Sequence, residues 1–311
     1  MHGPPVTTAS DMSPGDRCWA ILYGCHTSAR RDTHFVCTEL AEKTRYGHII
    51  VLLWSRIQDL PGLWMSPVGL ILQSDRRPWI IYDYTFIGIN DAVARQAPQE
   101  VIQFGMAFKR LLGKILSMEP AYVPVFLSDV DLSNSYMRVW VRPEDLPHLA
   151  FVIVLYPSDL EPLICFHLSL PMGFVDLSQL FCCTTETVDD MVNTLLIEGH
   201  TPSPNPLDAL SDSTPAADEA VGGRLPDPDT DRDLDKLFRN LLAVEAARLR
   251  RYDYSYVEDF CFLAQGGPAS QAAAQRHIFN KIDRVFRPND ANNCIRKEPN
   301  SLKNYGWAMR P

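Results

Sequence analysis

The stretch Tyr252-Asp253-Tyr254-Ser255-Tyr256-Val257-Glu258-Asp259-Phe260-Cys261-Phe262-Leu263 places two adjacent acids between aromatic and apolar residues. This pattern predicts two short β-strands joined by a tight turn, with Glu258 and Asp259 at or near its tip. Two neighbouring carboxylates repel each other. An apolar hairpin that carries both therefore either exposes them to water or offers them to a cation, and the hairpin alone leaves both interpretations open.

Length and composition place few limits on the fold. The 311 residues are enough for one large domain or two ordinary ones, and 46% of them are hydrophobic, which is normal for a globular core. No apolar run approaches the roughly 20 residues that a membrane helix needs, and no signal peptide is recognisable. We therefore expect a soluble intracellular protein, cytoplasmic or nuclear, with no membrane partner and with its eight cysteines reduced.

The net charge of −9 is concentrated in one segment. Residues 198–235 hold ten acids and two arginines, a net of −8, so the rest of the chain carries −9 − (−8) = −1. The same segment holds six prolines and few large apolar residues, which predicts a disordered insertion. A nearly neutral remainder with local basic patches is compatible with a nucleic-acid partner.

Outside this insertion the patterns predict a mixture of strands and helices. Strands are expected at 48–54, 68–73, 79–84, 123–130, 137–141, 149–156 and 163–170. Helices are expected at 98–118, after Gly173, at 237–249 and at 268–286. On the first of these helices Val101, Phe104, Phe108, Leu111, Leu112 and Ile115 are expected to face the core. Residues 1–15 are expected to be disordered, and residues 16–45 have too weak a pattern for a prediction.

The expected strand at 123–130 runs directly into Asp131. A single Asp at a strand end is usually a cap or a surface residue. Combined with the downstream acidic hairpin, however, Asp131 can bring three carboxylates to one point of a sheet. Such a group can hold two divalent cations about 4 Å apart for in-line nucleotidyl transfer. Carboxylate oxygens are suitable ligands for Mg²⁺.

Three segments resemble motifs of the reverse transcriptase domain of eukaryotic retrotransposons, and the resemblance covers roughly residues 46–307. Residues 128–139 resemble the first palm motif, in which the metal-binding Asp lies five residues before an aromatic, here Asp131 and Tyr136. Residues 170–175 resemble the motif that packs on the template and the incoming nucleotide. Residues 256–259 resemble the Tyr-x-Asp-Asp box. Residues 181–188 and the acidic insertion are similar to one retrotransposon lineage.

The resemblance implies an α+β right-hand polymerase that copies RNA into DNA. Residues 46–127 would form the fingers. Residues 128–197 and 236–311 would form a palm with an antiparallel sheet backed by helices, which the insertion at 198–235 divides. Residues 1–45 remain undefined, and the thumb would be missing or incomplete. The implied partners are a primed RNA or DNA template and a deoxynucleoside triphosphate.

The resemblance also implies roles for individual residues. Asp131, Glu258 and Asp259 would hold two Mg²⁺, or Mn²⁺ in their place. Tyr136 would lie under the sugar as a steric gate, with a core tyrosine as the simpler alternative. Met172 and Gly173 would let the backbone approach the nucleotide closely. Arg76 or Arg77 would contact the triphosphate, with a solvated basic turn as the alternative.

Three positions depart from the family pattern. Glu258 stands where the family has the first Asp of its catalytic box, and Trp79 stands where it usually has an Arg. Asp176 is followed by Leu177-Ser178 where the family usually has Ser-Pro. Since Mg²⁺ requires near-ideal octahedral geometry, the longer Glu side chain predicts weakened or lost activity.

These departures leave three functions open. The first is a reverse transcriptase, active or weakened. The second is a non-catalytic module in which the relic polymerase fold binds nucleic acid or a protein. The third is an unrelated α+β domain, and it predicts that the carboxylates of Asp131 and the hairpin lie more than about 10 Å apart, too far for a pair of bridged ions.

Overall fold

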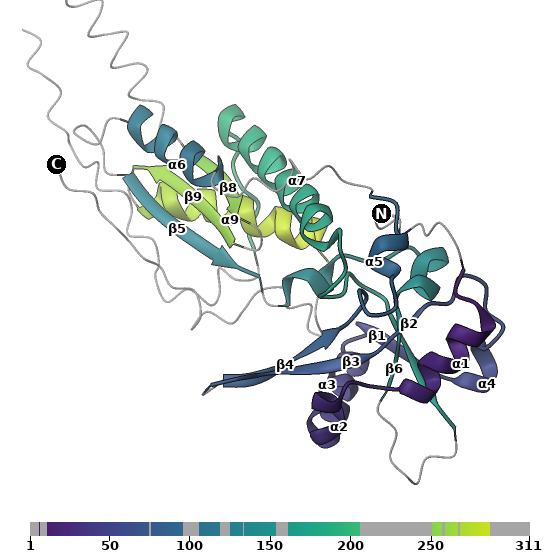
Figure 1. The fold of residues 1–311 in the computed structure, drawn as a ribbon. Coiled ribbons are helices and arrows are strands. Elements are labelled where there is room, and N and C mark those ends of the chain that lie inside the picture. Colours follow the sequence, from purple (N-terminus) through teal and green to yellow (C-terminus); the bar gives the residue numbers. More distant parts are fainter. Residues whose placement is uncertain are drawn as a thin grey trace, which may run out of the picture. The chain divides into compact units, whose positions relative to one another are not determined.

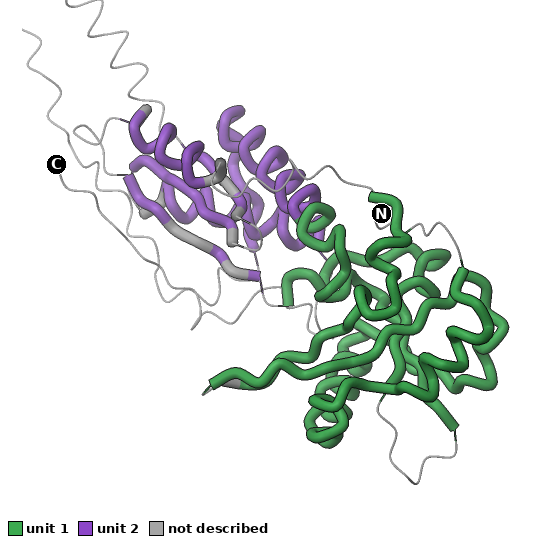
Figure 2. The backbone as a smooth tube through the Cα atoms, viewed as in Figure 1, with its two compact units in different colours: residues 1–101, 134–181, 287–293 green, residues 102–133, 182–286, 294–311 purple. Residues whose placement is uncertain are grey.

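The computed structural model describes Val6 and residues 11–74, 76–95, 106–118, 125–132, 134–153, 161–205, 251–256, 259–266 and 268–286. Within these residues the chain is a mixture of helices and β-sheets, as expected for an α+β fold. It divides into two compact units (Figure 2). Unit 1 comprises residues 1–101, 134–181 and 287–293, and unit 2 comprises residues 102–133, 182–286 and 294–311.

The N-terminal segment of unit 1 is helical, although its sequence pattern is weak. It forms α1 (Pro14–Tyr23), α2 (Thr27–Arg31) and α3 (Thr33–Arg45). Ser13 and Asp32 cap α1 and α3, because their side chains accept hydrogen bonds from backbone N–H groups in the first turns. Val6 is buried, and its N–H donates to Asp145 at 2.9 Å. The expectation of disorder over residues 1–15 is therefore wrong at Val6 and at the start of α1.

Unit 1 contains a four-stranded sheet with the order β1-β7-β6-β2 and a separate two-stranded sheet, β3-β4 (Figure 1). The strands are β1 (Ile49–Leu53), β2 (Met65–Ser66), β3 (Val68–Gln73), β4 (Arg76–Tyr82), β6 (Ala150–Val152) and β7 (Leu163–His167). Only β2 and β6 pair in parallel in these two sheets. Short helices α4 (Trp54–Ile57), α5 (Ile89–Ala92) and η3 (Pro143–Leu149) connect them. Each of the expected strands at 48–54, 68–73, 79–84, 149–156 and 163–170 thus contains or overlaps an observed strand.

The strand expected at 137–141 is wrong. The 3-10 helix η2 (Ser135–Arg138) covers its first residues, after Asn134 adopts a left-handed conformation with φ 50°. Beyond η2 a single β-bridge joins Trp140 to Ser169. Met137, Val139 and Val141 are nevertheless buried and Trp140 is exposed. Arg138, which a strand would expose, is 1% exposed, so three consecutive residues are buried at the helical turn and the alternation predicted for a strand is not observed.

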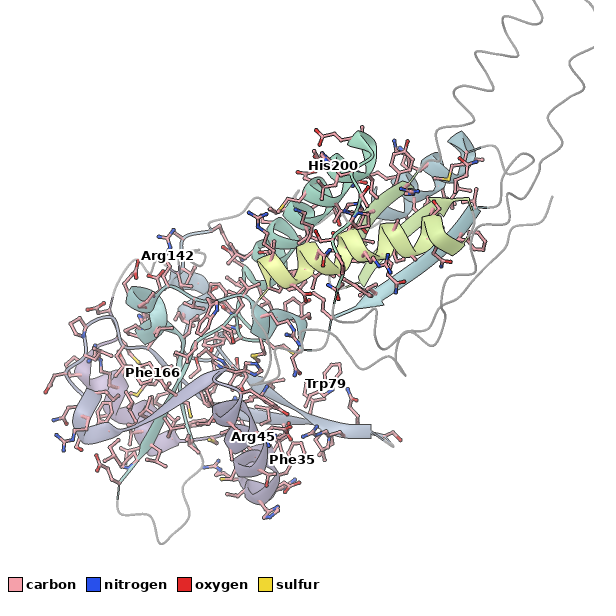
Figure 3. The ribbon with its side chains drawn as sticks, turned by 180° about the vertical axis from the view of Figure 1, so that it is seen from behind. Phe35, Arg45, Trp79, Arg142, Phe166 and His200 are labelled. Atoms are coloured by element: carbon pink, nitrogen blue, oxygen red, sulfur yellow. The ribbon has the colours of Figure 1, made fainter. Side chains whose placement is uncertain are left out.

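Unit 2 is built on a three-stranded antiparallel sheet with the order β5-β9-β8. Its elements are α6 (Met106–Ser117), β5 (Val125–Asp131), β8 (Arg251–Tyr256), β9 (Asp259–Gln265) and α9 (Pro268–Val285), together with most of α7 (Leu177–Glu198), within which the two units divide. The predicted hairpin is confirmed as β8–β9, while its turn at 257–258 lies outside the described residues. Figures 1 and 3, which view the molecule from opposite sides, show α9 across one face of this sheet.

Helix α6 packs on the opposite face from α9 and turns only part of its predicted apolar stripe to the core. Leu111 is buried against the sheet and Ile115 is partly buried, as expected. Phe108 and Leu112 are 63% and 42% exposed, so their placement in the core is wrong. Leu111 and Ile115 of α6, and Met118 directly after it, pack against the strands, and the Lys114 ammonium lies over the ring of Tyr252 on β8. The predicted core residues Val101 and Phe104 lie outside the described residues.

The beginning of the acidic segment is ordered against α9. Glu198 ends α7, and Asn205 is buried, with its amide donating to Asn280 at 2.7 Å and to Asp283 at 3.0 Å. Predicted disorder is therefore wrong for residues 198–205. Residues 206–250, which include the helix expected at 237–249, and residues 287–311 lie outside the described part. Among the described helices, none combines the length and apolar character needed to cross a membrane.

A candidate acidic site on the sheet of unit 2

The sheet of unit 2 pairs two of the three predicted metal ligands. Its register sets Asp131, the last residue of β5, directly opposite Asp259, the first residue of β9. Paired Cα atoms in antiparallel strands lie about 4.5–5.5 Å apart. Glu258 directly precedes Asp259 in the chain but lies outside the described residues, as do the side chains of Asp131 and Asp259. The backbone thus brings Asp131 to the end of the sheet from which the acidic turn departs.

Buried aromatic residues fix this register. Val130, Phe260 and Phe262 are at most 1% exposed, and the ring of Phe260 packs against that of Phe286, with their centroids 6.4 Å apart. A slip of one residue would move these side chains to the other face of the sheet, at the cost of their burial. The packing therefore holds Asp131 opposite Asp259.

The acid positions share a sheet face with the residues that contact α6. Alternation along the strands puts Asp131 on the same face as Leu127, and Asp259 on the same face as Leu263. Leu127 and Leu263 belong to the cluster that packs on α6, four residues away from the acids along each strand. Helix α6 thus covers one end of this face, and the acid pair lies at the other end.

A second acidic pair is buried between α7 and β8. Asp189 and Asp253 are 4% and 0% exposed, and the Asp253 side chain is one of the groups that act on the Asp189 carboxyl. Ser255 donates to Asp189 Oδ2 through its backbone N–H at 2.7 Å and its hydroxyl at 2.8 Å. Burial raises the pKa of the Asp189 carboxyl, and the charge of Glu186 adds to the rise, while the hydrogen bonds from Ser255 oppose it. Two buried carboxyl groups in contact favour holding a proton between them.

This pair predicts a loss of stability with rising pH. The pKa of Asp189 is raised from 3.8 to about 7, so the folded protein keeps a proton that the unfolded chain releases. The unfolding free energy of the wild type should fall between pH 4 and 7 relative to that of Asp189→Asn, by an amount on the order of 2 kcal/mol. Glu186, whose charge acts on Asp189, forms an ion pair with Arg110 of α6, and the charged atoms of this pair lie 3.5 Å apart. Urea unfolding at several pH values measures the difference.

The exposed neighbour Asp190 supplies the control for this prediction. Asp190→Asn should keep the pH dependence of the wild type, because it leaves the buried Asp189 carboxyl in place. Parallel stability curves for the wild type and Asp189→Asn would contradict the shared proton.

Tyr136 lies in unit 1, on η2, and is half-buried. Its ring meets that of Phe181 edge-on, with centroids 4.8 Å apart and an interplanar angle of 62°. This packing agrees with a core tyrosine, the simpler alternative. The steric-gate role stays a prediction.

Gly173 is required by the fold of unit 1. Its φ is +100°, and a Cβ atom at this position would overlap with the carbonyl oxygen of Tyr82 at the end of β4. Asn90 holds the same turn, since its amide donates to Gly173 O and its Oδ1 accepts from the Val175 N–H, each at 3.0 Å. Met172 is 39% exposed. The close approach seen here is to the chain's own backbone, and an approach to a nucleotide stays a prediction.

We expect Gly173→Ala to lower the unfolding free energy by about 2 kcal/mol or more, because it combines a disfavoured φ with steric overlap. Chemical denaturation monitored by the tryptophans of unit 1 tests this. Gly15→Ala, within α1 of the same unit, is the control, because only Ser13 Oγ lies near the added methyl group, at 3.8 Å. The unfolding free energy of this variant should equal that of the wild type or be slightly higher. Equal stability of Gly173→Ala and the wild type would contradict the conclusion that the fold requires glycine at position 173.

The predicted triphosphate contacts lie on the β3–β4 hairpin of unit 1. Arg77 pairs with Glu39 and Glu42 of α3, and its side chain is 63% exposed. A triphosphate would therefore have to compete with two carboxylates for this guanidinium. Trp79, two residues further along β4, is 52% exposed (Figure 3). The side chain of Arg76 lies outside the described part, and both arginine roles stay predictions.

Two sets of residues near the predicted motifs escaped the sequence analysis. Asp176, noted only as a departure, is fully buried beside α7 and pairs with Arg95 at 2.9 Å. An Asp directly before an apolar helix is a capping signal, but nothing in the local sequence indicates an ion pair with Arg95. Asp189 and Asn193 on α7 contact β8, and a polar pair four residues apart on a largely buried helix was the only signal for them.

The comparisons add no family assignment. No protein-family model matches the chain, and no curated protein matches it significantly. Among the side chains that the structure describes, no group of three or more His, Cys, Asp or Glu could hold a metal ion. That search does not extend to the side chains of Asp131, Glu258 and Asp259.

Proposed function

We propose that this chain is an RNA-directed DNA polymerase domain with weakened activity, whose unit 2 carries the palm carboxylates. The observation that carries the proposal is the pairing of Asp131 with Asp259 next to the acidic turn. It supports a shared role in metal binding for Asp131 and Asp259, although they lie 128 positions apart in the chain. It also weighs against an unrelated domain with widely separated acids, since paired Cα atoms are only about 5 Å apart.

The carboxylates suit the metal that the proposal requires. Asp131, Glu258 and Asp259 offer hard oxygen ligands of the kind that Mg²⁺ prefers. When bound, two Mg²⁺ supply activation of the primer 3′-hydroxyl and charge neutralisation at the α-phosphate of the deoxynucleoside triphosphate. The paired strands hold Asp131 and Asp259 in place, so that the ligands require little rearrangement. A primed template is the nucleic-acid partner in this proposal.

A non-catalytic nucleic-acid-binding module is the second candidate. It is favoured by Glu258, which is one methylene longer than the Asp of the family, and by the ion pairs that already engage Arg77. The two candidates differ in one property. A polymerase binds a nucleotide together with a divalent metal, whereas the module binds nucleic acid without either.

Isothermal titration of Mg²⁺ with a deoxynucleoside triphosphate tests the proposal. The wild type should bind the two together, and Asp131→Asn should bind at least tenfold more weakly, because it removes a charged ligand. Asp129→Asn is a matched control two residues away on β5. Equal binding by the wild type and Asp131→Asn would contradict the proposed metal site.

Primer extension with Mg²⁺ and with Mn²⁺ tests the polymerase activity itself. We expect slow extension that is lost in Asp131→Asn. Retained binding of a primed template without metal-dependent binding of nucleotide would favour the non-catalytic module. Fast, processive synthesis by the wild type would contradict the weakening assigned to Glu258.

A further inference from the structure

Strand β8 has an outer edge that no other strand covers among the described residues. The sheet order is β5-β9-β8, so β8 bonds to β9 on one side only. An uncovered strand edge leaves every second residue with an unpaired backbone N–H and C=O, and buried groups of this kind need partners. On β8 the residues concerned include Asp253 and Ser255, which are 0% and 7% exposed.

Side chains of α7 supply these partners. The Asn193 amide donates to Asp253 O at 2.8 Å and its Oδ1 accepts from the Asp253 N–H at 2.9 Å. Asp189 accepts from the Ser255 N–H and hydroxyl, as described above. Residues four apart on a helix have Cβ atoms about 5–6 Å apart, and alternate residues on a strand lie about 7 Å apart. The two spacings are similar enough for one face of α7 to reach both positions: Asn193 bonds to the N–H and the C=O of Asp253, and Asp189 accepts from the N–H of Ser255.

These contacts lie close to the candidate acidic site. Ser255 pairs across the hairpin with Phe260, and Tyr256 pairs with Asp259. Asp259 in turn pairs with Asp131. The hydrogen bonds of α7 therefore fix the strand one pair away from Asp259, immediately before the turn that contains Glu258.

We propose that Asp189 and Asn193 are positioning residues, which clamp the outer edge of β8 and so hold the acidic end of the hairpin opposite Asp131. The inference deepens the proposed function and rests on it, since it assigns the support of the metal site. The hydrogen bonds described for both residues go to β8. Their effect comes through β8, because a displacement of about 1 Å in a catalytic site can cost about 10²-fold in rate.

The clamp is tested by two measurements on the full chain. The first is the affinity for Mn²⁺, and the second is backbone amide exchange at residues 259–261, which needs no metal. Asp189→Ala and Asn193→Ala remove the acceptor or the donor that faces β8. Each should weaken Mn²⁺ binding about tenfold and speed the exchange by a similar factor, because the end of the hairpin is no longer held.

Two further variants separate positioning from general stability. Asp189→Asn keeps an acceptor oxygen for Ser255 and should restore both measurements to near the wild-type values. Asp190→Ala, one residue along α7 and exposed, should leave both unchanged. Asn193→Ala, at a half-buried position, provides the test if Asp189→Ala does not fold.

The outcomes distinguish this inference from the proposed function. Variants that lose stability but keep the wild-type Mn²⁺ affinity and exchange at 259–261 would overturn the clamp. If the wild type itself does not bind Mn²⁺, the proposed function fails, and the exchange measurement alone decides whether α7 holds the hairpin. Faster exchange in the two Ala variants, with recovery in Asp189→Asn, would support the clamp in either case.

Discussion

Replacing Glu258 by Asp is expected to raise the rate of primer extension about 10²-fold. Both residues carry the same charge, so the gain must come from geometry. Since the strand register holds Asp131 opposite Asp259, we expect the proposed metal site to accommodate the extra methylene of Glu258 poorly. Mg²⁺ tolerates little departure from octahedral geometry, and a misplacement of about 1 Å can cost about 10²-fold. Single-turnover extension with Mg²⁺ measures the effect.

A double variant provides the control for this gain. Adding Asp131→Asn to Glu258→Asp should abolish the increase, because a shorter acid cannot compensate for a missing ligand. Mn²⁺ should narrow the difference between wild type and Glu258→Asp, since it accepts less regular coordination than Mg²⁺. An unchanged extension rate in Glu258→Asp would place the weakening elsewhere, with the ion-paired Arg77 as the next residue to test.

The sequence predicted those elements whose packing follows a simple period. The β8–β9 hairpin places aromatic and apolar residues on both sides of two adjacent acids, and α9 repeats apolar residues every three or four positions, so both were predictable. Prediction from the sequence fails where the local period and the packing disagree. Residues 137–141 alternate like a strand but begin in a 3-10 turn, and Phe108 continues the apolar stripe of α6 but projects into solvent.

The elements of the candidate site were predictable from the sequence, but their pairing in space was not. The strand that ends in Asp131 and the acidic hairpin were both readable as separate elements. Their register was not, because it depends on which faces Val130, Phe260 and Phe262 bury, and these choices are made by the assembled sheet. The clamp on β8 was not predictable either, since a polar pair four residues apart on α7 does not identify the strand edge that Asp189 and Asn193 contact.

Replacing Phe260 by Ala should lower the unfolding free energy of unit 2 by about 3–5 kcal/mol. Phe260 is fully buried, contacts the ring of Phe286, and pairs with Val130 one position from Asp131. Removal of the ring leaves a cavity. It also makes a slip of the strand register less costly, because less apolar surface would lose its burial. The metal affinity should therefore fall even where the variant remains folded.

Phe108→Ala is the matched control, because it makes the same substitution in the same unit at a side chain that is 63% exposed. It should change the unfolding free energy by no more than about 0.5 kcal/mol. The comparison also tests whether Phe108 of α6 is exposed, as in the structure, or faces the core, as the sequence pattern predicts. If Phe108 faced the core, as its place in the apolar stripe suggests, both variants would lose similar stability. Urea unfolding of the two variants beside the wild type decides between an exposed and a buried Phe108. A small loss for Phe260→Ala would mean that the aromatic face does not hold Asp131 opposite Asp259.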